Sequence, residues 1–431
     1  MFPLFGFLVL ASTAFGADLE SVSSIPASAL DSLGDTAGSY GSGACYDRKA
    51  GILYLTTDRG PGDGAIDFSP RLYALPLPKE SASKSELNLK FKSDESGPPG
   101  TSGPTQTHLY KDPDGKPFSG LIPDSVDPEP RMKDGRRCLD PEGLALMEDG
   151  NLFVCEEYFP SVLQFKPDGT FLARFVPPEN YLPRSASGEV DFRPMENRTE
   201  GREDNRGFEG VALSPDGKTV YAVLQSGLLQ DGGKEAGATR LLAFDALTGT
   251  PRAEYAVRFT DPASLGERAK KLKTKNLVMS DLLCLPDGKI LALERDNRGQ
   301  DGSTDTKKAI FKSVCVLDLS GATDLLSLPD KPYSRRKADP KFKPLTANQP
   351  IEYVKKTLLF DFENLDLPSQ GLAWDQVPEK WEGLAFLAPD RLLVIADNDF
   401  LTPELTLGGR KIPFPKCHTQ VNTWLFTVKL R

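Results

Sequence analysis

The stretch GFEGVALSPDGKTVYAVLQ, residues 207–225, places an acidic residue between an aromatic residue and a glycine, at the start of the first of two short apolar runs. Pro-Asp-Gly, a sequence typical of a tight turn, separates the two runs. Apolar runs of this length joined by such a turn predict a β-hairpin, with the carboxylate of Glu209 at its open end.

Four further stretches repeat this plan. They are GACYDRKAGILYLTTDRG from Gly43, DPEGLALMEDGNLFVCEEY from Asp140, MSDLLCLPDGKILALERDN from Met279 and WEGLAFLAPDRLLVIADND from Trp381. A third strand-like run follows several of them. Self-similar units of several strands are typical of β-propeller proteins, so we predict an all-β fold with one such unit per blade.

The number of blades follows from the spacing of the repeats. The intervals after the first and the fourth repeat are long enough to contain another unit, so six blades are preferred and five to seven are allowed. We expect the ring to be closed by the C-terminal run NTWLFTVKL, paired with sequence near Tyr40–Asp47. Closure would remove exposed sheet edges. The only segment with helical character lies near Ala263–Lys271.

The acidic residues at the strand beginnings predict a cation site. The first strand of each propeller blade lines the central channel, so Glu142, Glu209, Asp281 and Glu382 are expected to converge at one end of the axis. Like charges in close contact are unfavourable unless they are neutralised. Ca²⁺ prefers carboxylate and carbonyl oxygens, and we predict that these four residues bind it. The alternative is that each carboxylate caps backbone amides at a loop.

Polar residues at the ends of the second strands predict a substrate site. Arg59 and Arg295 could hold an anionic group through bidentate contacts. For Arg295, an ion pair with Glu294 or Asp296 is the alternative. Three carboxylates and one guanidinium are assigned to catalysis: Glu142, Glu209, Glu382 and Arg295. The residues assigned to substrate binding are Asp58, Arg59, Asn297 and Asn398.

The N-terminus predicts export from the cell. Residues 2–15 carry no charge, are too few to span a membrane and precede small residues. Residues 1–16 are therefore interpreted as a signal peptide cleaved after Gly16, followed by an N-terminal extension, 17–38, and a propeller domain, 39–431. A secreted or periplasmic protein is expected. The six cysteines fit an oxidising compartment, either as disulfides or as buried thiols.

Composition and missing motifs exclude several classes of function. A formal net charge of −9 argues against a nucleic-acid partner. No segment approaches the ~20 apolar residues of a membrane helix. With two histidines, no G-x-S-x-G elbow, no phosphate-binding loop and no zinc motif, cation-assisted hydrolysis by carboxylates is favoured over covalent catalysis. A monomer acting on a small molecule is expected.

Several of these motifs together resemble the phytase-like family, which is described as having esterase-like activity of phytase. They are DPEGLAL from 140, NRGFEGVALSPDGKTVYAVLQ from 205, ILALERDN from 290, WEGLAF and LLVIADNDF from 381, with DRGP from 58 and PENYLP from 178. The resemblance covers roughly Ser39 to Leu430 and implies a secreted or periplasmic β-propeller. Two positions depart from the pattern: Asp281 stands where the other units carry Glu-Gly, and Gln225 stands where the family often has Glu.

Three functions are compatible with these observations. The first is a secreted, calcium-assisted hydrolase of phosphate or carboxylic esters. The second is a lactonase-like hydrolase of other small molecules that uses the same axial cation. The third is a non-catalytic propeller that binds a protein or polysaccharide, which would present an exposed apolar or aromatic patch on one face.

Overall fold

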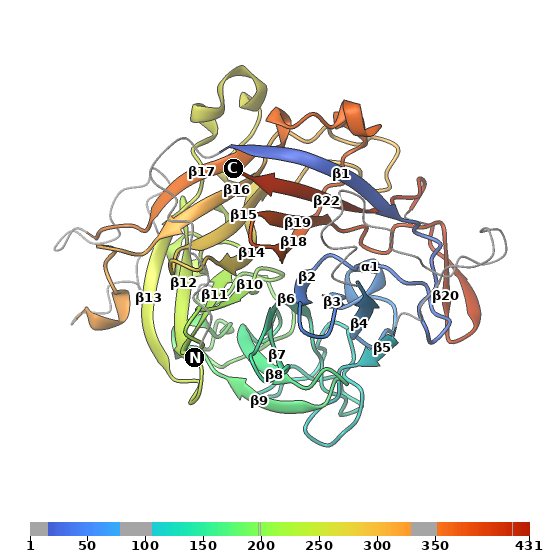
Figure 1. Cartoon of the computed structure of the whole chain (residues 1–431). Coiled ribbons are helices and arrows are strands. Elements are labelled where there is room, and N and C mark those ends of the chain that lie inside the picture. The colour runs from blue at the N-terminus through green and yellow to red at the C-terminus, as the bar shows by residue number, and fades with distance from the viewer. Residues whose placement is uncertain (1–15, 78–105, 197, 199, 329–350, 416) are drawn as a thin grey trace, which may run out of the picture.

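The computed structural model describes residues 16–77, 106–196, 198, 200–328, 351–415 and 417–431. Within them, five four-stranded antiparallel sheets are arranged around a central axis, as Figure 1 shows. The chain is therefore an all-β propeller, as the repeats predict. The predicted signal peptide lies outside the described residues except for Gly16 and stays a prediction.

Each sheet is one blade, ordered from the axis outward. The five blades are β2 (Gly43–Asp47), β3 (Ile52–Thr56), β4 (Arg71–Pro76) and β5 (Gln106–Leu109); β6 (Pro141–Leu146), β7 (Leu152–Glu156), β8 (Ser161–Phe165) and β9 (Phe171–Phe175); β10 (Phe208–Leu213), β11 (Thr219–Leu224), β12 (Ala238–Asp245) and β13 (Pro251–Arg258); β14 (Leu277–Cys284), β15 (Ile290–Asp296), β16 (Lys312–Asp318) and β17 (Lys355–Asp361); and β18 (Trp381–Ala388), β19 (Arg391–Ala396), β22 (Thr423–Leu430) and β1 (Ala17–Ile25).

The preference for six blades is wrong, although five lies within the allowed range. The innermost strands β2, β6, β10, β14 and β18 contact one another in sequence, and β18 contacts β2, so the ring is closed with five blades. The long intervals between repeats contain connections instead. One holds residues 110–140, which form turns and isolated bridges, and the rest of these intervals includes residues 78–105 and 329–350, outside the described residues.

The N-terminal strand closes the ring. β22 pairs with β19 on one side and with β1 on the other, so the first and the last strand of the described chain lie side by side in the same blade. The expected partner near Tyr40–Asp47 is wrong, because that segment forms the inner strand β2 of the first blade. A strand from the opposite end of the chain satisfies the outer edge of β22, which would otherwise expose unpaired backbone groups.

Short helices and one further hairpin lie in the connections between the blade strands. A hairpin of β20 (Glu404–Leu407) and β21 (Arg410–Pro413) follows β19, and the short helix α1 (Pro61–Gly64) follows β3. The segment expected to be helical contains a 3₁₀ helix, Pro262–Ala269. The other 3₁₀ turns are Glu179–Tyr181, Leu229–Asp231, Gly233–Glu235, Thr274–Asn276, Leu325–Ser327, Phe362–Asn364, Pro368–Gln370 and Trp374–Gln376. All six cysteines are free thiols, as one of the two alternatives had it.

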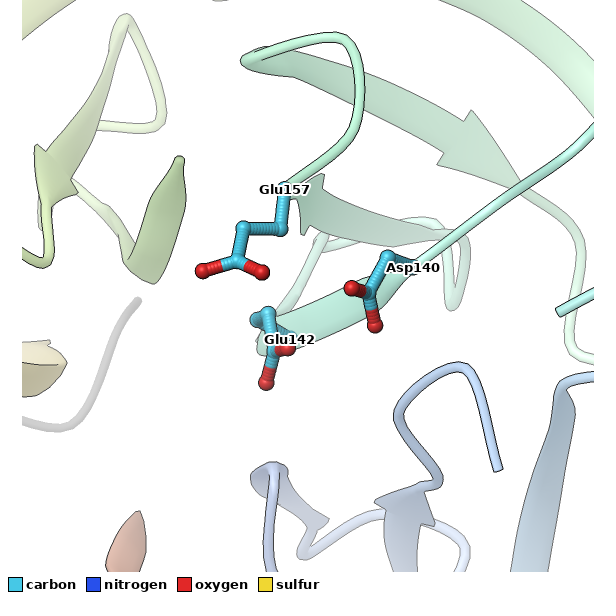
Figure 2. A group of neighbouring side chains, drawn as sticks. All are labelled: Asp140, Glu142 and Glu157. Atoms are coloured by element: carbon cyan, nitrogen blue, oxygen red, sulfur yellow. The ribbon is translucent and has the colours of Figure 1, made fainter. Parts of the chain in front are cut away.

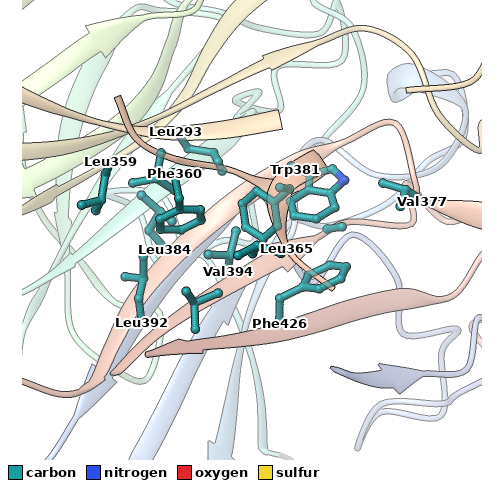
Figure 3. Packing of buried hydrophobic residues seen from close by; sticks show 14 of the residues in the cluster. Leu293, Leu359, Phe360, Leu365, Val377, Trp381, Leu384, Leu392, Val394 and Phe426 are labelled. Atoms are coloured by element: carbon teal, nitrogen blue, oxygen red, sulfur yellow. The ribbon is translucent and has the colours of Figure 1, made fainter. Parts of the chain in front are cut away.

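Apolar side chains between neighbouring blades form the core. Figure 3 shows the largest cluster, between the fourth and fifth blades. Trp381 stacks on Phe426, with ring centroids 4.3 Å apart, and meets the ring of Phe362 edge-on. Aromatic pairs of this kind add stabilisation beyond the area they bury. The blades are therefore held together by packing of their faces, since among the described residues no backbone ladder joins one blade's sheet to the next.

The glycine of the repeated Glu-Gly motif allows the inner strands to approach at the axis. A Cβ added to Gly143 would lie 2.7 Å from the backbone nitrogen of Val211 in the next blade. A Cβ on Gly210 would lie 2.7 Å from Cα of Asp281, in the blade after that. Only glycine fits such a backbone-to-backbone approach, which explains why glycine follows glutamate in the motif.

Gly143→Ala should destabilise the fold by about 1–3 kcal/mol, because backbone rather than a mobile side chain blocks the added methyl group. Gly383→Ala is the matched comparison, since its Cβ would lie 3.1 Å from the nearest atom, the carbonyl oxygen of Gly41. Urea denaturation of both variants measures the difference. A Gly143→Ala variant no less stable than Gly383→Ala would contradict this account of the motif.

Candidate functional site

Three glutamates enter the axial region from equivalent β-bulges. The register of β10 against β11 shifts between Phe208 and Gly210, which isolates Glu209 in the bulge. The same shift surrounds Glu142 in β6 and Glu382 in β18. A bulge turns a side chain out of the regular alternation and is frequent beside functional sites. The expected equivalence of these three carboxylates is therefore present in the register.

The fourth member of the expected acidic set differs. In β14 the register shift lies between Met279 and Asp281, so Ser280 occupies the bulge and Asp281 takes the place that glycine holds elsewhere. The buried carboxylate of Asp281 accepts hydrogen bonds from the backbone N–H of Leu282, at 2.8 Å, and of Leu384 in the next blade, at 2.7 Å. Asp281 therefore joins two blades.

A second set of polar residues stands at the ends of the second strands. Glu157, Gln225, Arg295 and Asp397 each lie next to the bulge of their own blade. Gln225 donates a hydrogen bond to the carboxylate of Glu209. Arg295 donates to the hydroxyl of Ser280, at 3.0 Å, and forms an ion pair with Glu382 of the neighbouring blade. The alternative given for Arg295, an ion pair with Glu294 or Asp296, is absent among the described residues, since Lys356 pairs with Glu294 and Lys312 with Asp296.

Three carboxylates of the second blade come close enough to share one ion. Asp140, Glu142 and Glu157 each offer an oxygen, and the three oxygens lie within 4.8 Å of one another. Figure 2 shows the three side chains as neighbours in this blade. All three are buried. Three hard oxygen donors in a small space are the ligands that Ca²⁺ takes in proteins, so the donor set fits this ion.

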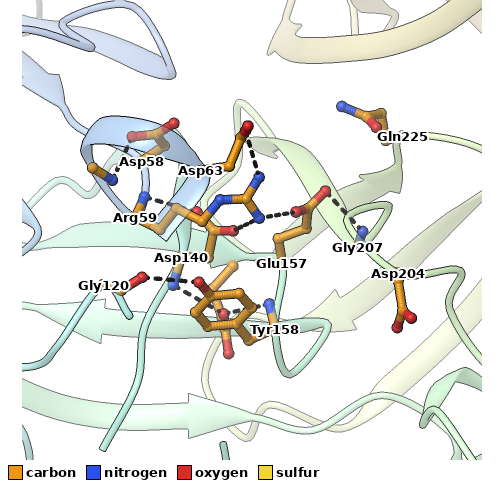
Figure 4. A network of polar contacts seen from close by, with 12 residues as sticks. Asp58, Arg59, Asp63, Gly120, Asp140, Glu157, Tyr158, Asp204, Gly207 and Gln225 are labelled. Atoms are coloured by element: carbon orange, nitrogen blue, oxygen red, sulfur yellow. Dashed lines mark hydrogen bonds and ion pairs between the residues drawn. The ribbon is translucent and has the colours of Figure 1, made fainter. Parts of the chain in front are cut away.

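Arg59 contacts two of these carboxylates, those of Asp140 and Glu157, as Figure 4 shows. Its backbone N–H donates to Oδ1 of Asp140 at 2.8 Å, and its guanidinium donates to Oδ2 at 2.9 Å. The guanidinium also reaches Glu157 at 3.5 Å and Asp63 at 3.2 Å. By contrast, the carboxylate of Glu142 makes no hydrogen bond or ion pair with the described residues. Glu142 is thus the carboxylate of this group that lacks a counter-charge.

Burial and mutual repulsion raise the pKa values of the axial carboxylates. The pKa of Glu142 is raised well above its usual value by burial, and then by Glu209 and Asp140. Burial also raises that of Glu209, with Glu157 and Glu382 adding to the shift. Burial raises the pKa of Asp140 to about 7, although Arg59 opposes the shift. Burial and like charges thus favour the protonated form of these carboxyls, and a bound cation would favour the ionised form.

The residues assigned to substrate binding have different surroundings. Asp58 is buried, accepts a hydrogen bond from the N–H of Gly60 and faces the ammonium of Lys380 at 3.9 Å. Burial, with help from Asp399, raises its pKa to about 8. The amide oxygen of Asn398 accepts from the N–H groups of Ser39 and Phe400, which shapes a loop. Asn297 is half-buried just beyond the end of β15.

The sequence analysis assigned no role to four residues of the site. Lys380 lies 3.2 Å from Asp399, and Asp140 and Glu157 belong to the three-carboxylate group. Arg206 has a buried Nη1 with no hydrogen-bond partner among the described residues, and Glu157 and Glu209 act on its charge. The signal for Asp140 and Lys380 was present, because both stand directly before the first strand of a repeat.

Backbone strain is concentrated around the same mouth. All five non-glycine residues of the described chain with positive φ lie there, four of them in loops and Asp63 in α1. They are Ser39, which bonds Asp397; Asp63, which pairs with Arg59; Asn205, beside Arg206; and Asp399 and Phe400, after β19. Strained conformations of this kind cluster at functional sites.

The fold and the site together define a five-bladed propeller with a buried, mostly acidic centre at one end of its axis. Residues 38–400 match the Phytase-like family, described as "Esterase-like activity of phytase". The chain therefore belongs to this family, and the resemblance found in its repeats is confirmed.

The chain is also similar to an individual protein. The chain is 28% identical to an uncharacterised secreted protein of Arthroderma benhamiae, in an alignment that covers 90% of this chain and 88% of that one. The expected secreted or periplasmic location is confirmed by this relationship. Among the described residues, no helix is long and apolar enough to cross a membrane.

Similar solved structures are distant ones. They include a luciferin-regenerating enzyme, 13% identical, with 95% of this chain and 96% of that one covered and a TM-score of 0.36. Regucalcin of Agrobacterium tumefaciens, a calcium-binding protein, is 13% identical, with coverages of 96% and 95% and a TM-score of 0.34. A gluconolactonase of Xanthomonas campestris is 10% identical, with coverages of 97% and 99% and a TM-score of 0.33.

Proposed function

We propose that this protein is a secreted hydrolase of phosphate or carboxylic esters whose reaction takes place at the axial mouth with Ca²⁺ bound. The observation that carries the proposal is the three-carboxylate group of Asp140, Glu142 and Glu157, in which Glu142 lacks a counter-charge among the described residues. The family description supports an esterase-type activity. When bound, the cation would neutralise the carboxylates and polarise an ester or phosphoryl oxygen.

Different side chains suit the remaining tasks. Glu209 has a raised pKa, and Gln225 orients its carboxyl, so Glu209 is assigned to proton transfer with the substrate or water. Arg206, with its unpaired buried Nη1, is assigned to an anionic group of the substrate. Arg295 is held by Glu382 and Ser280, and this ion pair positions the wall of the site.

Hydrolysis of p-nitrophenyl phosphate and p-nitrophenyl acetate by the mature protein tests the proposal. Turnover with calcium that disappears with chelator and falls strongly in Glu142→Gln is expected. Glu129→Gln, which changes a half-buried carboxylate paired with Arg131 and Arg137, should keep wild-type turnover. Absence of turnover of both esters, with calcium present, would overturn the assignment as an ester hydrolase.

Calcium should raise the melting temperature of the wild-type protein. A ligand that binds only the folded state stabilises it by mass action, by about 2.7 kcal/mol at a hundred times Kd. Glu142→Gln should reduce this rise, since the amide carries no charge, whereas Glu129→Gln should leave it unchanged. Thermal melts with calcium and with chelator measure both effects. Identical wild-type midpoints in the two conditions would contradict a cation at this site, whatever the protein hydrolyses.

A further inference from the structure

A cavity away from the axis lies beside the fourth blade. Its volume is about 450 Å³, and the loops that follow β13, β15 and β17 line it. These loops leave their sheets at the same end of the propeller as the axial mouth. Six of the lining side chains are basic: Arg268, Lys270, Lys271, Arg298, Lys307 and Lys308. Two are acidic, Glu267 and Glu363, so the lining carries 6 − 2 = +4 charges.

Ion pairs and a hydrogen bond connect the chain segments that line this cavity. Arg268, in the 3₁₀ helix Pro262–Ala269, forms ion pairs with Asp361 and Glu363. The indole N–H of Trp374 donates to the carbonyl oxygen of Ala309 at 2.9 Å. Three separate chain segments are thereby held in place, and the cavity is a built feature of the rim rather than a gap between mobile side chains.

Most of the positive charge in the lining is not neutralised. Lys270 lies 3.6 Å from Glu267, and Arg268 has the carboxylates just described. No carboxylate of the described residues pairs with Lys271, Arg298, Lys307 or Lys308. Four cationic groups therefore face the cavity without a protein counter-ion in the described part of the chain. Such a concentration raises the local potential and attracts anions.

This local charge is opposite to that of the whole chain, which is −9. At an ionic strength of 0.1 M, charges separated by more than about 10 Å are largely screened. An anion in the cavity therefore responds mainly to the lining side chains, which are the charges nearest to it. We propose that this rim cavity is a binding site for a small molecule that carries two or more phosphate or sulfate groups.

The size and lining of the cavity set the class of ligand. Its volume lies within the roughly 300–1,000 Å³ of small-molecule pockets. Arginine and lysine together bind multiply charged oxyanions well, since guanidinium gives planar bidentate contacts and ammonium gives a compact charge. The half-buried ring of Trp374 offers an apolar contact beside them. The proposal does not depend on hydrolysis at the axis.

Calorimetric titration with tripolyphosphate and, in a separate arm, with sucrose octasulfate tests the proposal. Chelator is present throughout, so that a cation at the axis contributes nothing. Lys307→Glu combined with Lys308→Glu should weaken binding at least tenfold at low salt. The matched control combines Lys166→Glu with Lys218→Glu, two exposed lysines on turns at the opposite end of the propeller, and should bind like the wild type. Glu142→Gln should also bind normally.

Tryptophan fluorescence gives an independent readout. The chain has three tryptophans, and only Trp374 lines the cavity, so the ligand-induced change should disappear in Trp374→Phe. Binding in one arm alone would identify the phosphate or the sulfate form of the ligand. Absence of binding in both arms, or equal weakening in the two double-lysine variants, would overturn the proposal.

Discussion

Glu209→Gln should lower kcat/KM for the hydrolysed ester by about 10²–10⁴-fold, the range usual for loss of a positioned acid or base. The substitution keeps the size of the side chain and removes its ionisable proton. The wall around it should persist, because Glu209 lies in a bulge whose flanking residues still pair with β11. Progress curves with p-nitrophenyl esters at saturating calcium measure the loss.

Two comparisons separate a role in proton transfer from a structural one. Glu235→Gln removes a half-exposed carboxylate paired with Lys275, outside the axial mouth, and should retain full activity. The melting temperature of Glu209→Gln in chelator should equal or exceed that of the wild type, because a buried, repelled carboxyl has been replaced by a neutral group. Activity within threefold of the wild type would exclude Glu209 from the chemistry.

Arg240→Ala should lower the free energy of unfolding by about 3–5 kcal/mol, because it leaves two buried carboxylates without their counter-charge. Arg240 pairs with Asp231 at 2.6 and 2.7 Å and with Glu254 at 2.8 Å. Tyr181, from the connection that precedes the third blade, donates to Glu254 at 2.6 Å. All four side chains are buried, so water cannot replace the lost contacts. Urea denaturation followed by intrinsic fluorescence measures the change.

An exposed pair in the same blade supplies the control. Arg252 pairs with Asp245 at the surface, where solvent screens the interaction, and Arg252→Ala should leave the denaturation midpoint nearly unchanged. Arg240→Lys should fall between the wild type and Arg240→Ala, because it keeps the charge but loses the planar fork. Equal midpoints for Arg240→Ala and Arg252→Ala would mean that the buried network contributes little to stability.

Local pattern was enough to predict the class of fold. Turn residues and apolar runs of strand length repeat five times, and each repeat became the two inner strands of a blade. The outer strands were harder to place, because β1 pairs with β22 from the opposite end of the chain. A pairing between chain ends leaves no local signal, so the expected closing segment was wrong. The blade number depends in the same way on packing around the axis.

The three glutamates of the repeated motif also followed from the sequence alone. Their equivalence is a matter of register within each hairpin, and the repeats encode that register. Asp281 was grouped with them because an acidic residue stands close to the corresponding position of its repeat. In the structure Ser280 occupies the bulge position that the glutamates hold in the other repeats. Asp281 follows it and bonds to the next blade.

Which carboxylates meet was decided only by the tertiary structure. Glu142 could be assigned to the axis from its repeat, but its grouping with Asp140 and Glu157 depends on how the first strand and the end of the second strand of that blade turn. Arg59 reaches this group from another blade, and Arg295 pairs with Glu382 across a blade boundary. Hydrogen bonds within a hairpin fix the position of a residue along its strand, and the local sequence of the hairpin encodes them. Contacts between charges from different blades depend on the closure of the ring, because only five inner strands packed face to face bring those side chains within bonding distance.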